Sequence, residues 1–351
     1  MALSIIKPDT RIDFVGSRKY AFMLSGALIL IGLISLLIKG GPRYGIDFAG
    51  GMVVQVKFKQ EIKLNKIKSA LTQQGLTKVV VQRFGTAGDN EYLLRLPVEK
   101  KDSEQIKQLI QTALTQAVGK GNFTIQRLEM VGPKVGKDLK NKAMQALFYA
   151  VLLIAIYISG RFEYKWVASG LLAVGLGVGI YLLQLLSLPM SILTVAALLI
   201  SLFLFWYFNF KYALGAVIAL LHDVTITVGI FSLLNKDFDL TIVAALLTII
   251  GYSLNDTIIV FDRIRENLKS KKQSSLAEII NVSINQTLSR TILTSGTTLM
   301  VVICLLLFGG AIIHDFAFAL FIGIIVGTYS SIYVASPILL SFEKQSQEEP
   351  A

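Results

Sequence analysis

Eight long apolar segments constrain the fold of this chain more than any other feature of its sequence. Most are close to the ~20 residues that a helix needs to cross the hydrocarbon core of a bilayer. Of all residues, 54% are hydrophobic and 16% charged, whereas soluble domains carry about 25% charged residues. The sequence therefore predicts an α-helical polytopic membrane protein with about eight transmembrane helices. The predicted spans are 21–38, 143–158, 166–186, 190–208, 212–234, 238–261, 291–310 and 316–341.

The net charge of +11 follows from where the basic residues lie. When eight spans are threaded from the N-terminus, the basic clusters near the membrane ends all fall on one side. By the positive-inside rule both termini are cytoplasmic, with a cytoplasmic segment at 1–20 and a cytoplasmic tail at 342–351. Anionic lipid, and not nucleic acid, is the expected partner of this charge. No convincing cleavage site follows the first span, at 21–38, so we expect a retained anchor.

One long polar segment, residues 40–138, lies between the first two spans and, by the same topology, outside the cytoplasmic membrane. Its hydrophobic pattern changes repeatedly between period 2 and period 3.6. The order of these runs is β-α-β-β-α-β, which is typical of a ferredoxin-like α+β domain. We therefore expect a periplasmic ferredoxin-like domain, followed by a transmembrane bundle at 139–341. The predicted strands are 51–58, 78–84, 91–96 and 123–131, and the predicted helices are 65–75 and 103–118.

The membrane part contains an internal repeat. Residues 161–199 align without gaps onto residues 209–247, at an offset of 48. Repeats of this kind indicate tandem duplication, so we expect a duplicated helical hairpin at about 161–208. The first copy has Val174 and Gly175 where the second has His222 and Asp223. The first copy therefore lacks the polar chemistry of the second.

A carboxylate lies inside the sixth predicted span, in the stretch GYSLNDTIIVFDRIRE. Asp256 precedes Arg263 by seven residues, which places it roughly 10 Å inside the cytoplasmic boundary. Tyr252 and Ser253 extend the same helix face. Ionisable residues at this depth usually face a protein interior or a water-filled path. Asp256 is therefore a candidate proton carrier, although it and Asn255 could instead hold helices together by hydrogen bonds.

The next span opens with SRTILTSGTTLM and carries a polar stripe headed by a cation. Arg290, Thr294, Thr297 and Thr298 follow one another at i, i+4, i+7 and i+8. The spans of Asp256 and Arg290 are consecutive, and Arg290 enters from the side nearest Asp256. We expect a reversible ion pair between them, which protonation of the acid would break.

His222 and Asp223 lie near mid-membrane, about 17 Å along a helix that starts after Lys211. Aspartate and histidine in series are typical of proton paths, and a structural role for Asp223 is the alternative. One charge crossing the membrane supplies about 2.3 kcal/mol per 100 mV. This is comparable to the few kcal/mol that separate two states of a helix bundle. The residues therefore predict a proton-coupled membrane machine with an external domain.

Other conspicuous residues have simpler interpretations. Cys304 lies within a span and is expected only to pack, so we predict no disulfide or metal site. His314 and Asp315 open the last span, as helix-capping residues do. In YGIDFAGG, a tight turn that feeds the first strand is favoured over a phosphate loop. No nucleophile-base pair or cofactor motif indicates an enzyme. The turn residues of this segment are Gly45, Asp47, Gly50 and Gly51.

Four ordered motifs together resemble the SecF family of the bacterial Sec protein-translocation machinery. The resemblance covers nearly the whole chain except about 161–208. SecF is related to the resistance-nodulation-division (RND) transporters, so the resemblance implies an RND-like bundle in the bacterial cytoplasmic (inner) membrane. It also implies SecD, the SecYEG channel, YajC and translocating preproteins as partners, with protons as the coupling ion and no cofactor. The motifs are YGIDFAGG, ALGAVIALLHD, GYSLNDTIIVFDRIREN and SRTILTSGTTL.

By the same resemblance, Asp256, Arg290 and Asp223 correspond to the family's intramembrane relay residues. The supporting positions are Asn255, His222, Ser253, Thr294 and Thr298, which depth and spacing had already indicated.

The chain departs from the family in its span number, because the family normally has six. Deleting the 48-residue unit restores the usual pattern, and the extra pair of spans preserves the orientation of everything after it. Two other functions remain open: a small-molecule antiporter subunit of the RND type, and a translocon scaffold that transports nothing. An antiporter requires a substrate pocket within the bundle. A scaffold predicts that neutralising Asp256 has little effect.

Overall fold

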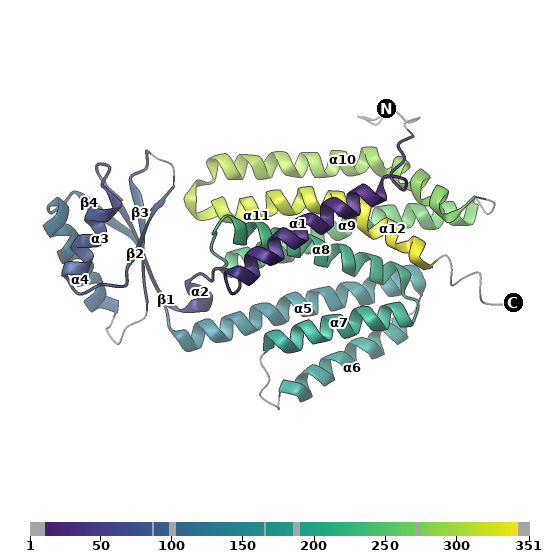
Figure 1. The fold of residues 1–351 in the computed structure, drawn as a ribbon, viewed down its shortest axis with the longest axis horizontal. Helices are drawn as coiled ribbons and strands as arrows, with labels where there is room; N and C mark the ends of the chain where they lie inside the picture. Colours follow the sequence, from purple (N-terminus) through teal and green to yellow (C-terminus); the bar gives the residue numbers. More distant parts are fainter. Residues whose placement is uncertain are drawn as a thin grey trace.

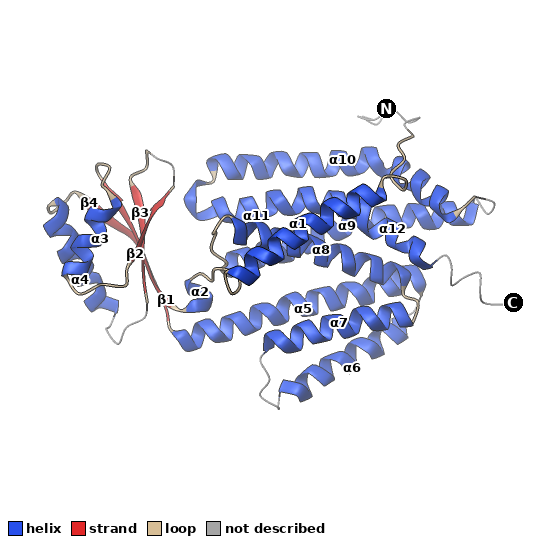
Figure 2. Ribbon diagram, in the orientation of Figure 1, coloured by secondary structure: helices blue, strands red, loops and turns tan. Residues whose placement is uncertain are grey.

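The computed structural model describes residues 11–85, 88–97, 103–164, 166–184, 190–270 and 274–342. It has two parts, a small sheet covered by two helices and a long helical bundle (Figure 1). The strands are confined to the small part (Figure 2). The last two residues of the predicted span 166–186 and the predicted tail after residue 342 lie outside the described residues.

The small part is a ferredoxin-like domain, as predicted. Its antiparallel sheet has the order β2-β3-β1-β4, and Val54 of β1 is paired with Leu94 and Leu128 on its two sides. Alternate β1 residues point to one face, where they are buried against Ile67 and Ile110 of the two helices. The elements are β1 (Gly51–Phe58), α3 (Leu64–Gln73), β2 (Val80–Phe84), β3 (Glu91–Leu96), α4 (Ser103–Val118) and β4 (Phe123–Val131).

Each of the eight predicted spans coincides with a helix. Six helices of the described part are long and apolar enough to cross a membrane, which makes the chain a multi-pass membrane protein. The shorter α6 and α7 occupy the other two predicted positions, and their crossing of the membrane stays a prediction. The helices are α1 (Arg18–Ile38), α5 (Pro133–Glu163), α6 (Trp166–Gln184), α7 (Met190–Tyr207), α8 (Lys211–Leu233), α9 (Leu240–Ser270), α10 (Leu276–Phe308) and α11 (Gly310–Ser330). After α11 the chain continues through a π-helical turn (Ser331–Ala335), α12 (Ser336–Ile338) and a 3₁₀ turn (Leu339–Phe342).

The boundary between the two parts differs from the one predicted at residue 138. Helix α5 begins at Pro133, and only Gly132 separates it from β4. Proline suits the first helical position because its missing N–H has no partner there anyway. The lysines and Asp138 that made this stretch look like part of the soluble domain lie in the first turns of the helix.

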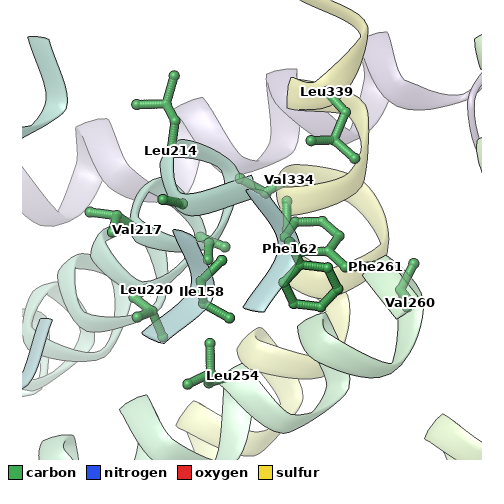
Figure 3. Packing of buried hydrophobic residues seen from close by; sticks show 14 of the residues in the cluster. Ile158, Phe162, Leu214, Val217, Leu220, Leu254, Val260, Phe261, Val334 and Leu339 are labelled. Atoms are coloured by element: carbon green, nitrogen blue, oxygen red, sulfur yellow. The ribbon is translucent and has the colours of Figure 1, made fainter. Parts of the chain in front are cut away.

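Helix α8 lies at the centre of the bundle and packs against α1, α5, α7, α9 and α11. Phe162 of α5 meets Phe261 of α9 edge to face beside it, with ring centroids 5.8 Å apart (Figure 3). A Cβ atom built on Gly32 of α1 would lie 2.9 Å from the Cα atom of Gly229. Small residues at such crossings allow two helix backbones to approach closely in a membrane. The central position of α8 puts its polar residues inside protein.

The hairpin of α6 and α7 is peripheral. Both helices pack against α5 and against each other, and α7 also contacts α8 (Figure 1). Phe148 and Leu152 of α5 form a small apolar cluster with Ala197 of α7. The extra pair therefore covers one side of the bundle and leaves the contacts among α8, α9, α10 and α11 in place.

Candidate functional site

The carboxylate of Asp223 is enclosed by the bundle, with 0% of the residue exposed. Its Oδ1 atom lies 2.9 Å from Nδ1 of His222. Its Oδ2 atom accepts hydrogen bonds from Ser253 of α9 at 2.6 Å and from Ser330 of α11 at 2.9 Å. Three helices therefore meet at one side chain. We call Asp223, His222, Ser25, Ser253 and Ser330 the Asp223 cluster.

The cluster extends through His222 to α1. The Nε2 atom of His222 lies 2.9 Å from Oγ of Ser25, and Ser25 donates to the hydroxyl oxygen of Tyr329 at 3.2 Å. Tyr329 in turn donates to the carbonyl of Ala21 at 2.7 Å. Each hydroxyl has one hydrogen to give, so in the arrangement where Ser25 donates to Tyr329, Nε2 of His222 is the donor to Ser25.

The direction of these bonds constrains the His222–Asp223 pair. With Nε2 as a donor, a neutral imidazole would have a bare Nδ1 facing the carboxylate oxygen. The short contact between Nδ1 and Oδ1 thus requires one proton between the two atoms, carried by the ring or by the acid. In this arrangement the pair holds an exchangeable proton.

Helix α11 reaches the Asp223 cluster at a glycine. A Cβ atom at Gly327 would lie 2.9 Å from Cβ of Ser253 and 3.4 Å from Oδ2 of Asp223. The π-helical turn Ser331–Ala335 follows directly, and Ser336 donates across it to the carbonyl of Ser331 at 2.8 Å. Single π turns inside helices are frequent at functional sites. Here the turn starts next to Ser330, which binds the carboxylate.

Asp256 forms a second, smaller cluster. It is 1% exposed, and its Oδ2 atom accepts a hydrogen bond from Ser295 of α10 at 3.0 Å. Thr328 of α11 lies 2.8 Å from Oγ of Ser295. Asp256, Ser295 and Thr328 are called the Asp256 cluster below. Ser253 is one turn away along α9, so this helix carries members of both clusters.

The predicted ion pair between Asp256 and Arg290 is absent from this structure. Arg290 is exposed, and among the described side chains no carboxylate lies within salt-bridge distance of it. Instead it lines a cavity of about 490 Å³ together with the exposed Asn255. Two ion pairs border this cavity, Arg161 with Asp262 at 2.6 Å and Arg263 with Glu266 at 3.0 Å. The cavity is therefore strongly polar, and it reaches the residue next to Asp256.

The inward face of α10 also differs from the prediction. Thr291 and Ser295 are buried, whereas Thr294, Thr297 and Thr298 donate to carbonyls of their own helix. The face that is buried, with Thr291 and Ser295, is offset by one residue from the face that was predicted. One residue corresponds to about 100° around the helix axis. Polar residues are adjacent in this stretch, so their spacing alone could not select the face.

Five residues of the two clusters and their extension were not predicted. They lie in apolar helices either alone, as Ser25 does, or in short polar runs such as Thr328–Ser331, and neither arrangement gives a periodic signal. Their role is visible only because helices far apart in sequence meet at Asp223 and Asp256. These residues are Ser25, Ser295, Thr328, Tyr329 and Ser330.

Two simpler predictions are corrected as well. Cys304 is exposed and faces away from the bundle, so it does not pack within this chain. Helix α11 begins at Gly310, upstream of His314 and Asp315, and Asp315 pairs with Lys236 at 2.5 Å instead of capping the helix. In the part of the chain that the structure describes, no group of His, Cys, Asp and Glu could hold a metal ion.

The YGIDFAGG segment turns into β1, but it is more than a tight turn. Ile46–Ala49 form one helical turn, α2, which is followed by Gly50 and Gly51 at φ values of 72° and 141°. At Gly51 a Cβ atom would lie 3.0 Å from the carbonyl oxygen of Leu96. Both glycines thus adopt backbone conformations that other residues disfavour. Gly45 and Asp47 contact the loop between α8 and α9.

Comparison with known proteins shows to which family this chain is related. The family model "Protein export membrane protein SecD/SecF, C-terminal" matches residues 110–200 and 183–345, and the SecD/SecF GG motif matches 34–62. SecF of Calditerrivibrio nitroreducens is 41% identical over 96% of both chains. The chain belongs to the SecF family. SecF of Vibrio alginolyticus is 40% identical over 98% of this chain and 93% of its own. The relatives are named as protein translocase subunits.

The fold agrees with this family. SecDF of Thermus thermophilus, described as a translocon-associated membrane protein, superposes with a TM-score of 0.75 at 31% identity over 97% of this chain. SecDF in a super-membrane-facing form gives a TM-score of 0.60. The chain spans 40% of the length of those SecDF chains. The two matches to the C-terminal SecD/SecF model overlap at 183–200, within the extra hairpin of this SecF-family chain.

Proposed function

We propose that this translocase subunit uses the proton motive force to assist preprotein export across the bacterial cytoplasmic membrane. The observation that supports this proposal best is the buried contact of 2.9 Å between Nδ1 of His222 and Oδ1 of Asp223, an arrangement that can hold one proton between the two atoms. An ionisable pair within a membrane bundle is costly, and such pairs mark proton relays. The hydroxyl donors around Asp223 come from α9 and α11, so a change in its charge acts on three helices.

Loss of the shared proton has a direct structural consequence. A bare Nδ1 then faces an anionic Oδ1, and the two repel. The imidazole must move its remaining proton to Nδ1, which removes the donor to Ser25, or swing away from Asp223. The first response turns the Ser25 hydroxyl from Tyr329 towards Nε2 and so breaks a bond between α1 and α11, whereas the second breaks the contact between α8 and α1. Proton transfer thereby becomes helix movement.

Asp256 and Arg290 supply the second half of the proposed relay. The polar cavity brings water to Asn255, beside Asp256, from the membrane side that holds Arg263. Arg290 lines the same cavity without an acidic partner among the described residues. It is placed to pair with a deprotonated Asp256 in another arrangement of α9 and α10. A reversible ion pair between Asp256 and Arg290 is therefore part of the proposed relay.

The exposed polar residues at membrane depth support a partner subunit. Asn255 and Arg290 are exposed in this chain, and lipid in contact with them would leave them without hydrogen bonds. SecDF chains are longer than this one, so a SecD subunit is the proposed cover. SecYEG, YajC, preproteins and anionic lipid are the further proposed partners, and protons are the sole coupling ion. Both termini are cytoplasmic in this proposal, and no catalytic chemistry is required.

The two competing functions differ from this proposal in what they need. A small-molecule antiporter needs an enclosed pocket in the bundle for its substrate. The cavity near Asp256 is instead open and lined by charged pairs, which suits water better than an organic molecule. A scaffold needs no titratable group. Neutralising the carboxylates should therefore impair a proton-driven subunit and leave a scaffold unaffected.

The test is preprotein export in cells depleted of their own SecF and supplied with variants of this chain. We expect Asp256→Glu to support export and Asp256→Asn or Asp223→Asn to fail, at equal abundance and equal SecD association. Asp138→Asn is the matched control, because this exposed α5 carboxylate pairs with Lys142 and lies outside both clusters and the cavity. Normal export by both Asn variants would leave the scaffold as the function.

A further inference from the structure

The loop between α8 and α9 is bound to the YGIDFAGG segment by backbone hydrogen bonds. The N–H of Gly45 donates to the carbonyl of Phe238 at 2.9 Å, and the N–H of Phe238 donates to the carbonyl of Arg43 at 2.7 Å. Tyr44 and Phe238 form a parallel β-bridge. A Cβ atom at Gly45 would lie 3.0 Å from Cβ of Asp239, so glycine permits this approach. The segment and the loop form one small backbone unit.

Asp47 of the same segment caps helix α9. Its Oδ2 atom accepts a hydrogen bond from the N–H of Leu240 at 3.0 Å, and Asp239 accepts from the N–H of Ile242 at 3.0 Å. The first N–H groups of a helix lack partners within the helix, and carboxylates there also favour the helix dipole. Asp239 lies just before α9 in the chain, whereas Asp47 lies almost 200 positions earlier. Asp47 thereby ties the start of α9 to α2.

An apolar contact supports the same junction. Phe48 of α2 is buried between Ala143 of α5 and Val243 of α9. A Cβ atom at Gly136 of α5 would lie 3.0 Å from the carbonyl oxygen of Phe48. Backbone bonds, a helix cap and a buried ring therefore hold the segment against α5 and α9 at once. Such a combination favours a joint that stays closed.

The sheet of the soluble domain joins this unit through Arg95. Arg95 of β3 forms an ion pair with Asp237 of the α8–α9 loop, and Arg43 approaches the same carboxylate at 3.1 Å. The Nε atom of Arg95 is buried without a hydrogen-bond partner. Replacing Arg95 leaves Asp237 paired with Arg43, so the change removes the contact of the soluble domain without stranding the carboxylate. The domain is thus bound to the loop by charge as well as by the covalent chain.

Helices α8 and α9, which this loop connects, carry Asp223 and Asp256. We propose that the YGIDFAGG segment and Arg95 form a rigid joint that passes movement of the α8–α9 hairpin to the soluble domain. This inference rests on the proposed function and assigns positioning roles to Asp47 and Arg95. A static anchor is the alternative, and it would affect the amount of folded protein without separating proton use from export.

The test compares Arg95→Gln with Arg95→Lys and with Arg83→Gln in complexes containing SecD. Arg83 is the matched control, because it pairs with Glu61 inside the soluble domain and does not reach the bundle. Export is measured in depleted cells, and proton uptake is measured in inverted vesicles with a pH-sensitive dye. We expect Arg95→Gln to lower export about fivefold or more, the lower end of typical coupling between sites. Its proton uptake should match wild type, and Arg95→Lys and Arg83→Gln should export normally.

Three results would overturn the joint. Normal export by Arg95→Gln would show that Arg95 has no role in coupling. Equal loss of export and of proton uptake in this variant would instead favour a static anchor that the proton relay needs for its structure. Absence of proton uptake by the wild-type complex would overturn the proposed function and the joint with it. That last outcome is recognised in the unmutated protein, so the two failures are distinguishable.

A cross-link tests rigidity separately. Tyr44→Cys and Phe238→Cys, in a Cys304→Ala background, place two thiols on bridged residues of adjacent backbone segments. Such neighbours lie within the Cα separation that a disulfide spans. We expect oxidation to leave export unchanged, because a rigid joint is closed throughout the cycle. Loss of export on oxidation, restored by a reductant, would show that the joint must open.

Discussion

The two buried carboxylates sit in different surroundings although both lie inside the bundle. Asp223 has partners on α8, α9 and α11 and is linked through His222 to α1. Asp256 has one hydroxyl donor and lies beside a residue that lines the polar cavity. The first carboxylate is therefore built into the packing of the bundle. The second is held by fewer bonds and lies beside the polar cavity, which suits its proposed role of exchanging a proton with one side of the membrane.

The largest expected difference between them is in stability. Asp223→Ala leaves His222 and two serines without their common acceptor, and loss of one partner from a buried charged network typically costs about 3–5 kcal/mol. Asp256→Ala removes a single hydrogen bond, and such bonds in membrane bundles average about 0.6 kcal/mol. Unfolding of the purified variants by SDS in mixed micelles measures both. Equal losses would contradict the distinction between the two sites.

A smaller effect is expected where α11 approaches the Asp223 cluster. Gly327→Ala places a methyl group 2.9 Å from Cβ of Ser253, and overpacking of this kind costs about 1–3 kcal/mol. The matched control is Gly296→Ala on α10, where an added Cβ has no atom within 4 Å. The same SDS titration compares the two variants. A tolerated Gly327→Ala with normal export would mean that α11 does not need this close approach.

The smallest effect concerns the two faces of α10. Ser295→Ala removes the same hydrogen bond to Asp256 and is expected to cost about 0.6 kcal/mol. Thr294→Val removes a hydroxyl of similar chemistry from the neighbouring face, where it only bonds its own helix. We expect this variant to unfold and export like wild type. If Thr294→Val were the more damaging change, the helix face predicted from spacing would be the working one.

The sequence predicted the elements of the fold better than their contacts. Apolar length and periodicity depend on local residues, so the helices and strands and their order along the chain followed directly from them. Asp223 and Asp256 were found because an ionisable side chain in an apolar helix is costly wherever it points. The contacts of Ser25 and Ser330 depend on helix crossings, and that of Asp47 on a loop almost 200 residues away. Pairings of this kind leave no local pattern.

The single-residue connection at Gly132 has a mechanical consequence. Helix α5 starts there beside the sheet, runs for 31 residues and ends beside the polar cavity, where Arg161 pairs with Asp262. At 1.5 Å per residue it is a continuous helix about 46 Å long. Rotation of such a helix by a few degrees about one end displaces the other end by several ångströms. Through α5 the soluble domain is therefore linked to the part of α9 that carries Asp262, in addition to its direct contacts with the bundle.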